Sequence, residues 1–271
     1  KRALRRGLEN PVNKTERIEQ VQHEALMALG RMGVPEDDAR NLWQRLGDEY
    51  FLREDSKAIA HHTQAILEHH QPDIPLVTLE KNTFRSHEGA TEIFIYTQDA
   101  PNLFAATVST LDQLHLSVQD ARIIVSDNGY ALNNYTVLTE DNQPLSENPD
   151  YLENIRQRLI EELDDPEDYP DIVQRRVPRQ LKAFATKTRV LISNDPNLQQ
   201  TVLEVITADR PGLLARIGHI FVQFGITLRK AKIANVGERV EDFFFITDHD
   251  DQPISDPDLC QTLQKAICEQ L

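Results

Sequence analysis

A short segment near the C-terminal end of the chain has the residue types needed to hold both an anion and a cation. It reads Asp-Arg-Pro-Gly-Leu-Leu from Asp209 to Leu214, and it lies where an apolar run ends and a helical pattern begins. Proline suits the first turn of a helix, and glycine lets the backbone come close to a ligand. The N–H groups of Gly212, Leu213 and Leu214 would then point to one spot that favours a carboxylate. Because the Asp209 side chain could hold an ammonium group nearby, the segment predicts a site for an α-amino acid.

This segment has a copy that begins 110 positions earlier, at Asp99, and includes Asn102 and Leu103. The two copies stay in step downstream, because residues 121–123 (Ala-Arg-Ile) correspond to residues 231–233 (Ala-Lys-Ile). An internal repeat of this length indicates duplicated domains rather than a solenoid, since each unit has enough residues for a small core. Asn102 stands where the second copy has Gly212, so the first turn is expected to approach a ligand less closely.

Each copy is predicted to fold in the order strand, helix, strand, strand, helix. The elements are expected at residues 92–97, 101–114, 116–126, 130–139 and 149–163 in the first copy, and at residues 201–207, 211–224, 226–236, 240–247 and 257–270 in the second. Residues 127–129, Asp-Asn-Gly, are typical of a hairpin turn. This order predicts an antiparallel sheet with both helices on one face, the ferredoxin-like arrangement, and therefore an α+β fold class.

The second copy lacks a strand pattern after its last helix, so its fourth strand must come from another segment. Residues 188–193 are the candidate, and we expect them to pair with residues 201–207. We also expect the two repeats to pair through their sheets or helices with approximate two-fold symmetry. The reason is that each small sheet leaves an edge or a face to cover.

Five parts are expected along the chain. They are a helical segment over residues 1–70, a connector over 71–90, the first repeat over 91–163, a charged linker over 164–187, and the second repeat with its preceding strand over 188–271. Apolar periodicity predicts the helices of the first part. The connector could contain one short strand at residues 76–79. The linker is acidic and then basic, which is typical of a solvated segment, although it could also dock on a partner or another domain.

Composition excludes several classes of function. The net charge of −15 argues against binding to nucleic acid. Since no apolar stretch approaches membrane-spanning length and no signal segment opens the chain, we expect a cytoplasmic protein that does not bind membranes. Cys260 and Cys268 lie too far apart on one predicted helix for a disulfide and are expected to be free thiols. The chain begins at Lys1 and is expected to be part of a longer protein.

The turn and the β-α-β-β-α order resemble ACT domains, which are small ligand-sensing modules of amino-acid metabolism. The second repeat carries the closer resemblance. Residues 218, 225–226, 231–233 and above all 237–244 (Gly-Glu-Arg-Val-Glu-Asp-Phe-Phe) resemble the last ACT domain of the bifunctional uridylyltransferase/uridylyl-removing enzymes of bacterial nitrogen regulation. Residues 4–7, 43–45, 50–53, 62 and 89–95 resemble the helical segment of that family and the entry to its first ACT domain, although His61 stands where the family tends to have Trp.

This resemblance implies the regulatory C-terminal part of a longer enzyme, in which nucleotidyltransferase and HD hydrolase domains precede the ACT pair in cis. It implies that glutamine bound to the ACT pair restrains uridylylation of the PII signalling protein and favours uridylyl removal. Neither catalytic motif occurs in this sequence. The chain is therefore expected to hold no catalytic residue, metal site or cofactor and to be inactive alone, with Mg²⁺ implied for the parent enzyme only.

The residues expected to bind the ligand belong to the two turns and to one neighbouring strand. They are Asp209, Arg210, Pro211, Gly212, Leu213, Leu214, Asn235, Asp99, Asn102 and Leu103. The sequence leaves open whether one or both repeats bind. Two other functions are also open: an ACT pair that controls a different amino-acid-regulated enzyme, and a hydrolase that uses the histidines at positions 61, 62, 69 and 70. Ile59 and Ile66 share a helix face with His62 and His69, which favours packed histidines over metal ligands.

Overall fold

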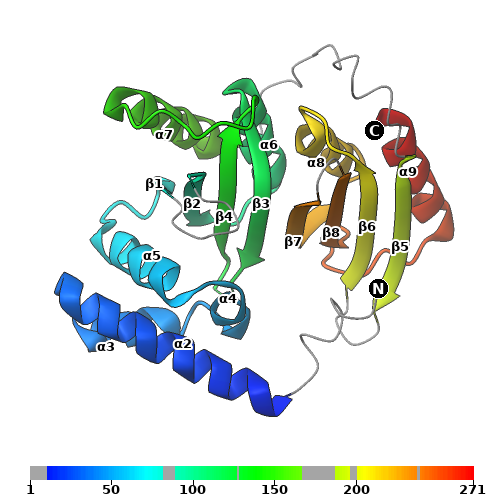
Figure 1. Ribbon diagram of the computed structural model, residues 1–271. Coiled ribbons are helices and arrows are strands. Elements are labelled where there is room, and N and C mark those ends of the chain that lie inside the picture. Colours follow the sequence, from blue (N-terminus) through cyan, green and yellow to red (C-terminus); the bar gives the residue numbers. More distant parts are fainter. Residues whose placement is uncertain (1–10, 82–88, 127, 167–186, 196–199, 237–238) are drawn as a thin grey trace. The chain divides into compact units, whose positions relative to one another are not determined.

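The computed structural model describes all residues except 1–10, 82–88, 127, 167–186, 196–199 and 237–238 (Figure 1). Within helices and strands, the side chains of residues 11–13, 195 and 234–236 are also not described. The chain divides into two compact units, one of residues 1–72 with 126–130, and one of residues 73–125 with 131–271. The charged linker expected over residues 164–187 falls mostly outside the described residues.

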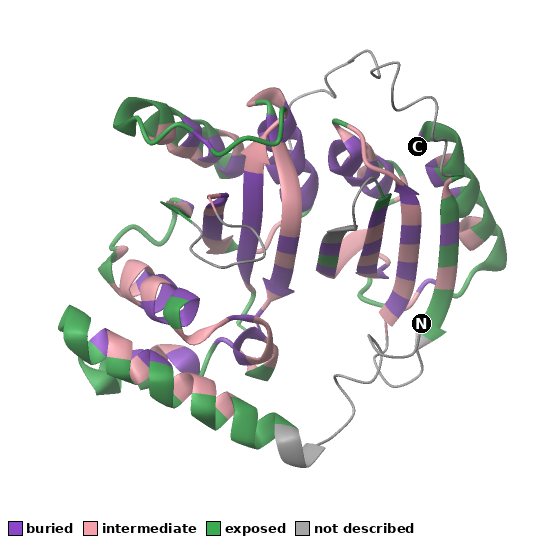
Figure 2. Cartoon of the chain, viewed as in Figure 1, coloured by how far each residue is buried: buried purple, intermediate pink, exposed green. Residues whose placement is uncertain are grey.

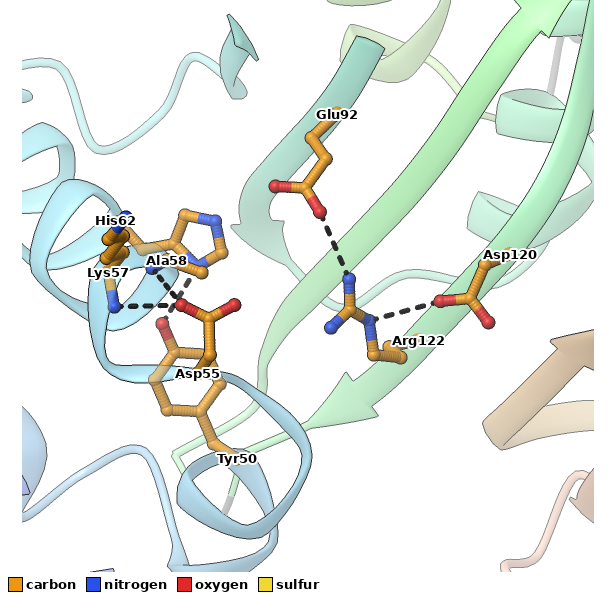
Figure 3. A network of polar contacts seen from close by, with 8 residues as sticks. All are labelled: Tyr50, Asp55, Lys57, Ala58, His62, Glu92, Asp120 and Arg122. Atoms are coloured by element: carbon orange, nitrogen blue, oxygen red, sulfur yellow. Dashed lines mark hydrogen bonds and ion pairs between the residues drawn. The ribbon is translucent and has the colours of Figure 1, made fainter. Parts of the chain in front are cut away.

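The first unit is helical, as the apolar periodicity predicted. Its described helices are α2 (Pro11–Met32), α3 (Glu36–Trp43), α4 (Asp48–Arg53) and α5 (Ser56–Glu68). Asp55 caps α5, because its side chain accepts hydrogen bonds from the N–H groups of Lys57 and Ala58 (Figure 3). In the core of the unit, the Trp43 indole donates a hydrogen bond of 2.8 Å to the Thr63 hydroxyl.

In the second unit, each repeat has four strands and two helices among the described residues. The first repeat contains β1 (Leu76–Lys81), β2 (Thr91–Gln98), α6 (Leu103–Gln113), β3 (Leu116–Val125), β4 (Tyr130–Thr139) and α7 (Pro149–Asp164). The second contains β5 (Arg189–Asp195), β6 (Gln200–Ala208), α8 (Leu213–Gln223), β7 (Thr227–Val236), β8 (Arg239–Thr247) and α9 (Pro257–Gln270). The fold is therefore α+β with two ferredoxin-like repeats, as the element order predicted.

The fourth strand of the second repeat comes from the segment that the sequence indicated. β5 pairs with β6 in antiparallel register, from Arg189 opposite Ile206 to Asp195 opposite Gln200. β1 has the same place in the first repeat, since it pairs antiparallel with β2. In both repeats, one edge strand is therefore formed by the segment that precedes the repeat in the sequence. The strand expected at residues 76–79 extends two residues further than predicted.

The helices of both repeats share one face of the sheet with a single apolar core. Burial alternates strictly along β6, as Figure 2 shows, so Leu203 and Val205 point into that core. Leu159 of α7 and Ile267 of α9 belong to the same cluster. Polar side chains lie on the other face of β2 and β3, where the Arg122 guanidinium stands 3.4 Å from both Glu92 and Asp120 (Figure 3).

The two repeats join edge to edge into one sheet in the order β1-β2-β4-β3-β7-β8-β6-β5. β3 and β7 run antiparallel, and Arg122 lies opposite Lys232, its own counterpart 110 positions further on. Ala121 lies opposite Ile233, and their counterparts Ala231 and Ile123 lie opposite each other. This register gives the pair an approximate two-fold axis, as expected, and it covers one of the two edges that each repeat alone would expose.

Helices α6 and α8 pack against each other beside this axis. Gly218 on α8 lies so close to α6 that a Cβ atom there would be 2.9 Å from the Cα of Ala105. The Ser109 hydroxyl and His219 Nε2 are 3.2 Å apart, and these two residues are again counterparts at a separation of 110. The contact places the C-terminal half of α6 beside the beginning of α8, which positions the candidate site.

Candidate ligand site at the paired turns

Both copies of the turn have the same backbone conformation. In the second repeat the Leu213 N–H donates a hydrogen bond of 3.2 Å to the carbonyl oxygen of Arg210, and Gly212 has φ 72° and ψ 13°. These values define a type II turn with Pro211 in its second position and the left-handed residue in its third. In the first repeat Asn102 has φ 66° and ψ 0°, and the Leu103 N–H donates to the Ala100 carbonyl at 3.3 Å.

The turn corrects two details of the sequence prediction. Helices α6 and α8 begin at Leu103 and Leu213, two residues later than expected, because the proline belongs to the turn rather than to the helix. The Leu213 N–H is already used inside the turn, so it cannot be one of three donors for a ligand carboxylate. Asn102 adopts the same positive φ as Gly212, since asparagine tolerates this conformation better than most residues.

Asp112 of the first repeat lies directly beside the turn of the second. A Cβ atom at position 212 would be 3.4 Å from both carboxylate oxygens of Asp112, which is buried with 5% of its surface exposed. The counterpart of Asp112 in the second repeat is Val222, which carries no charge. The second turn is thus bordered by the other repeat's carboxylate, and the candidate site is composite.

Asp209 supplies a second carboxylate at this turn. Partial burial raises the pKa of its carboxyl group, and a hydrogen bond from the Arg210 backbone N–H opposes this rise. A carboxylate that is partly removed from water interacts more strongly with a cation than an exposed one does. Asp209 and Asp112 therefore favour the positively charged end of a ligand.

Two guanidinium groups accompany these carboxylates. Burial lowers the pKa of Arg210, and the neighbouring positive charge of Arg216 lowers it further. Arg216 lies one turn into α8, and its N–H donates to the Gly212 carbonyl. A cation whose charged form is disfavoured by burial and by a neighbouring cation is stabilised by an anion placed beside it. The second turn thus offers both signs of charge.

The first turn has a different electrostatic environment. Ala100 and Ala106 stand at the positions that correspond to Arg210 and Arg216. Burial raises the pKa of Asp99, but the positive charge of Arg229 opposes this rise. Arg229 belongs to β7 of the second repeat, and its Nη1 lies 3.7 Å from Asp99 Oδ2. The carboxylate of the first turn is therefore already paired with a guanidinium group from the other repeat.

The sequence-predicted residues are brought together only in part. Asp209, Arg210, Pro211, Gly212, Leu213 and Leu214 form the second turn, and Asp99, Asn102 and Leu103 form the first. Asn235 lies on β7 opposite Val240, but its side chain is outside the described part of the structure. Asp112, Arg216 and Arg229 were not predicted. Aligning the two repeats would have marked them, because at each of these positions one copy is charged and the other is not.

The histidine-rich helix does not resemble a metal centre. His62 is buried, and its Nδ1 lies 2.9 Å from the Tyr50 hydroxyl (Figure 3). His69 follows the end of α5 as its C-terminal cap. Within the described ranges, no group of three or more His, Cys, Asp or Glu side chains could hold a metal ion.

Cys260 and Cys268 are free thiols. Of the helices in the part that is described, none is long and apolar enough to cross a membrane.

Comparison with known proteins identifies domains in both units. Residues 13–65 match the family described as the uridylyltransferase GlnD fifth domain, and residues 201–259 match the ACT domain. Over all 271 residues, the chain is 54% identical in sequence to the bifunctional uridylyltransferase/uridylyl-removing enzymes of Pseudomonas aeruginosa (strain LESB58) and of Azotobacter vinelandii (strain DJ). The corresponding enzyme of Stutzerimonas stutzeri (strain A1501) is 52% identical.

Over its whole length, the chain is similar to the C-terminal part of this enzyme. It spans 30% of the length of each of these three relatives. The matched fifth domain coincides with helices α2 to α5, and the matched ACT domain runs from β6 into α9. The region that holds the candidate site is thus the ACT-type pair rather than the helical unit.

Proposed function

We propose that this chain is the regulatory region of a bifunctional uridylyltransferase/uridylyl-removing enzyme, and that its ACT pair senses glutamine. One observation carries the proposal most directly: the second turn combines the carboxylates of Asp209 and Asp112 with the guanidinium groups of Arg210 and Arg216. A free α-amino acid is a zwitterion, so it can pair with both kinds of charge at once. Glutamine itself is the ligand that the family resemblance implies.

In this proposal the ammonium group of glutamine binds to Asp209, with Asp112 adding negative charge nearby. The carboxylate faces the beginning of α8 and Arg210, where the helix dipole and the guanidinium both favour an anion. Each ligand charge then meets an opposite charge on leaving water, which avoids the free-energy penalty of an unmatched buried ion. Because Asp112 comes from the first repeat and Asp209 from the second, bound ligand would connect the repeats.

The catalytic steps are proposed to take place in other domains of the enzyme. We propose that uridylyl transfer to the PII signalling protein and its removal occur in upstream domains in cis, with Mg²⁺ bound there, in a cytoplasmic enzyme. The role of the present chain is to alter the balance of these activities, since the free energy of glutamine binding can shift an equilibrium between two states of the whole enzyme. The chain alone would neither attach nor remove uridylyl groups.

Calorimetric titration of the purified 271-residue chain with each of the twenty amino acids tests the proposal. We expect heat of binding with glutamine and much weaker binding with glutamate. The side-chain amide of glutamine is uncharged, whereas the side-chain carboxylate of glutamate carries a negative charge. Binding of a different amino acid in preference to glutamine would indicate that the ACT pair senses another metabolite. The absence of binding by any amino acid would reduce the two turns to structural elements.

A further inference from the structure

The two strands at the centre of the sheet each contain a β-bulge at the same place. The pairing of β3 with β4 shifts register between Val118 and Asp120, and the pairing of β7 with β8 shifts between Leu228 and Lys230. The residues at these shifts are Gln119 and Arg229, which are counterparts 110 positions apart. A bulge turns a side chain away from the regular alternation of a strand, and bulges are common beside binding sites.

Arg229 uses its bulge to reach the turn of the other repeat. Its Nη1 lies 3.7 Å from Asp99 Oδ2, its Nη2 contacts Asp251, and its Nε lies 3.4 Å from the Thr247 hydroxyl. The side chains of Arg229 and Asp99 are only 22% and 23% exposed. All three guanidinium nitrogens are thus engaged, and Thr247 and Asp251 hold the group in place against the first turn.

Gln119 occupies the equivalent bulge with a neutral side chain. Its amide nitrogen donates to the Ser117 hydroxyl at 2.8 Å and to Asn142 Oδ1 at 3.3 Å. Asn142 corresponds to Asp251, and both have positive φ, of 55° and 61°. The same architecture therefore holds an arginine–aspartate ion pair in one repeat and an amide pair in the other. The first turn thus faces an arginine, whereas the counterpart of that arginine in the other repeat is a neutral glutamine.

We propose that Arg229 is a built-in occupant of the first turn, so that the chain binds one amino acid rather than two. Its guanidinium takes the place at Asp99 that the ligand's ammonium group takes at Asp209. The inference rests on the proposed function of the second turn and adds the residue that sets the stoichiometry. A ligand at the first turn would have to displace a cation held by three neighbours, whereas at the second turn the equivalent position is uncharged.

Replacing Arg229 with the residue of the other bulge tests this inference. Calorimetric titration with glutamine should give one site per chain for the wild type and two for Arg229→Gln. The new site should be weaker than the first by roughly one to two orders of magnitude, because Ala100 and Ala106 provide no charge-assisted hydrogen bond. Adding Asp99→Ala to Arg229→Gln should remove the new site only. The converse variant Gln119→Arg should weaken binding at the second turn at least tenfold.

Lys265→Gln is the matched control, because it removes one positive charge from an exposed position on α9 and should leave one site with unchanged affinity. One site in both the wild type and Arg229→Gln would overturn the role of Arg229 and leave the proposed function intact. Two binding sites in the wild type would likewise overturn the role of Arg229 and leave the proposed function intact. No site in the wild type but one in Arg229→Gln would support the role of Arg229 and refute binding at the second turn. No site in either protein would overturn both.

Discussion

Asp99 and Asp209 have equivalent positions in two type II turns, yet different neighbours give them different properties. Burial raises the pKa of both carboxyl groups, but only for Asp99 does the cation of Arg229 oppose that rise. Asp99 is thus already paired with a charge from the protein. Asp209 is placed with Asp112, Arg210 and Arg216, which together suit a zwitterion.

Removing the two aspartates one at a time should therefore have unequal effects on ligand affinity. Asp209→Ala removes the carboxylate that contacts the desolvated ammonium group, which commonly costs a few kcal/mol, or on the order of a hundredfold in affinity. Asp99→Ala should change the affinity for glutamine by less than about threefold, a fraction of the energy of one hydrogen bond. Calorimetry with both variants measures this difference. Equal losses would indicate one shared site, and no loss at Asp209 would leave the turn purely structural.

Affinity for glutamine should also depend on pH through Asp209. Its pKa is raised above 3.8, so the folded chain takes up a proton there at a higher pH than an unfolded chain does. This proton contributes stability that is fully present below pH 3.8 and is lost as the pH rises through the folded-state pKa. Binding has the opposite sign, because only the ionised carboxyl attracts an ammonium group. Titrations at decreasing pH should show weakening that begins above pH 3.8, and Asp209→Asn should remove this dependence.

At the scale of elements, the close contact of α6 with α8 brings Asp112 to the second turn. Gly218 permits that contact, because its missing Cβ would lie 2.9 Å from the Cα of Ala105 and 3.3 Å from the Val108 side chain. Glycine inside a helix costs about 1 kcal/mol relative to alanine. Here the close packing of α6 against α8, which a larger residue would prevent, offsets this loss of helix stability.

Gly218→Ala should therefore destabilise the chain although alanine is the better helix former. Overpacking of this kind costs about 1–3 kcal/mol, and over most of that range the cost is larger than the gain in helix propensity of about 1 kcal/mol. Gly30→Ala on α2 is the matched control, because no heavy atom lies within 4 Å of a Cβ there, and it should stabilise its helix. Urea unfolding followed by circular dichroism compares the two variants. A stabilising Gly218→Ala substitution would show that α6 can move away without loss.

Elements were easier to predict from the sequence than their chemical environment. The strands and helices of both repeats, and the edge strand β5, follow from apolar periodicity and from the comparison of the two copies. A tight turn was expected here, but its type II geometry and the later helix start were not, because Asp-x-Pro-Gly suits both the first turn of a helix and a separate β-turn. The roles of Asp112 and Arg229 could not be predicted, since both depend on which edges of the two sheets meet.

At the scale of the whole molecule, the eight strands of the second unit form one sheet over one core. The apolar cluster runs without a break from Val77 of β1 to Leu271, and it includes residues of both repeats. Edge-to-edge pairing of β3 with β7 therefore joins the two repeats through a common sheet and a common core. Under the proposed function, a ligand at the second turn would contact this unit where the repeats meet.

Glutamine should consequently protect backbone amides of both repeats from hydrogen exchange. A ligand at a hundredfold excess over its dissociation constant stabilises the folded state by about 2.7 kcal/mol, which slows exchange through global unfolding of the unit about a hundredfold. The effect should include β3 and α6 of the first repeat, because Asp112 contributes to the site from there. Mass-spectrometric exchange with and without glutamine measures it, with Asp209→Asn as the variant that should gain no protection. Protection confined to residues 200–271 would mean that the first repeat contributes nothing to binding, and the composite site would have to be abandoned.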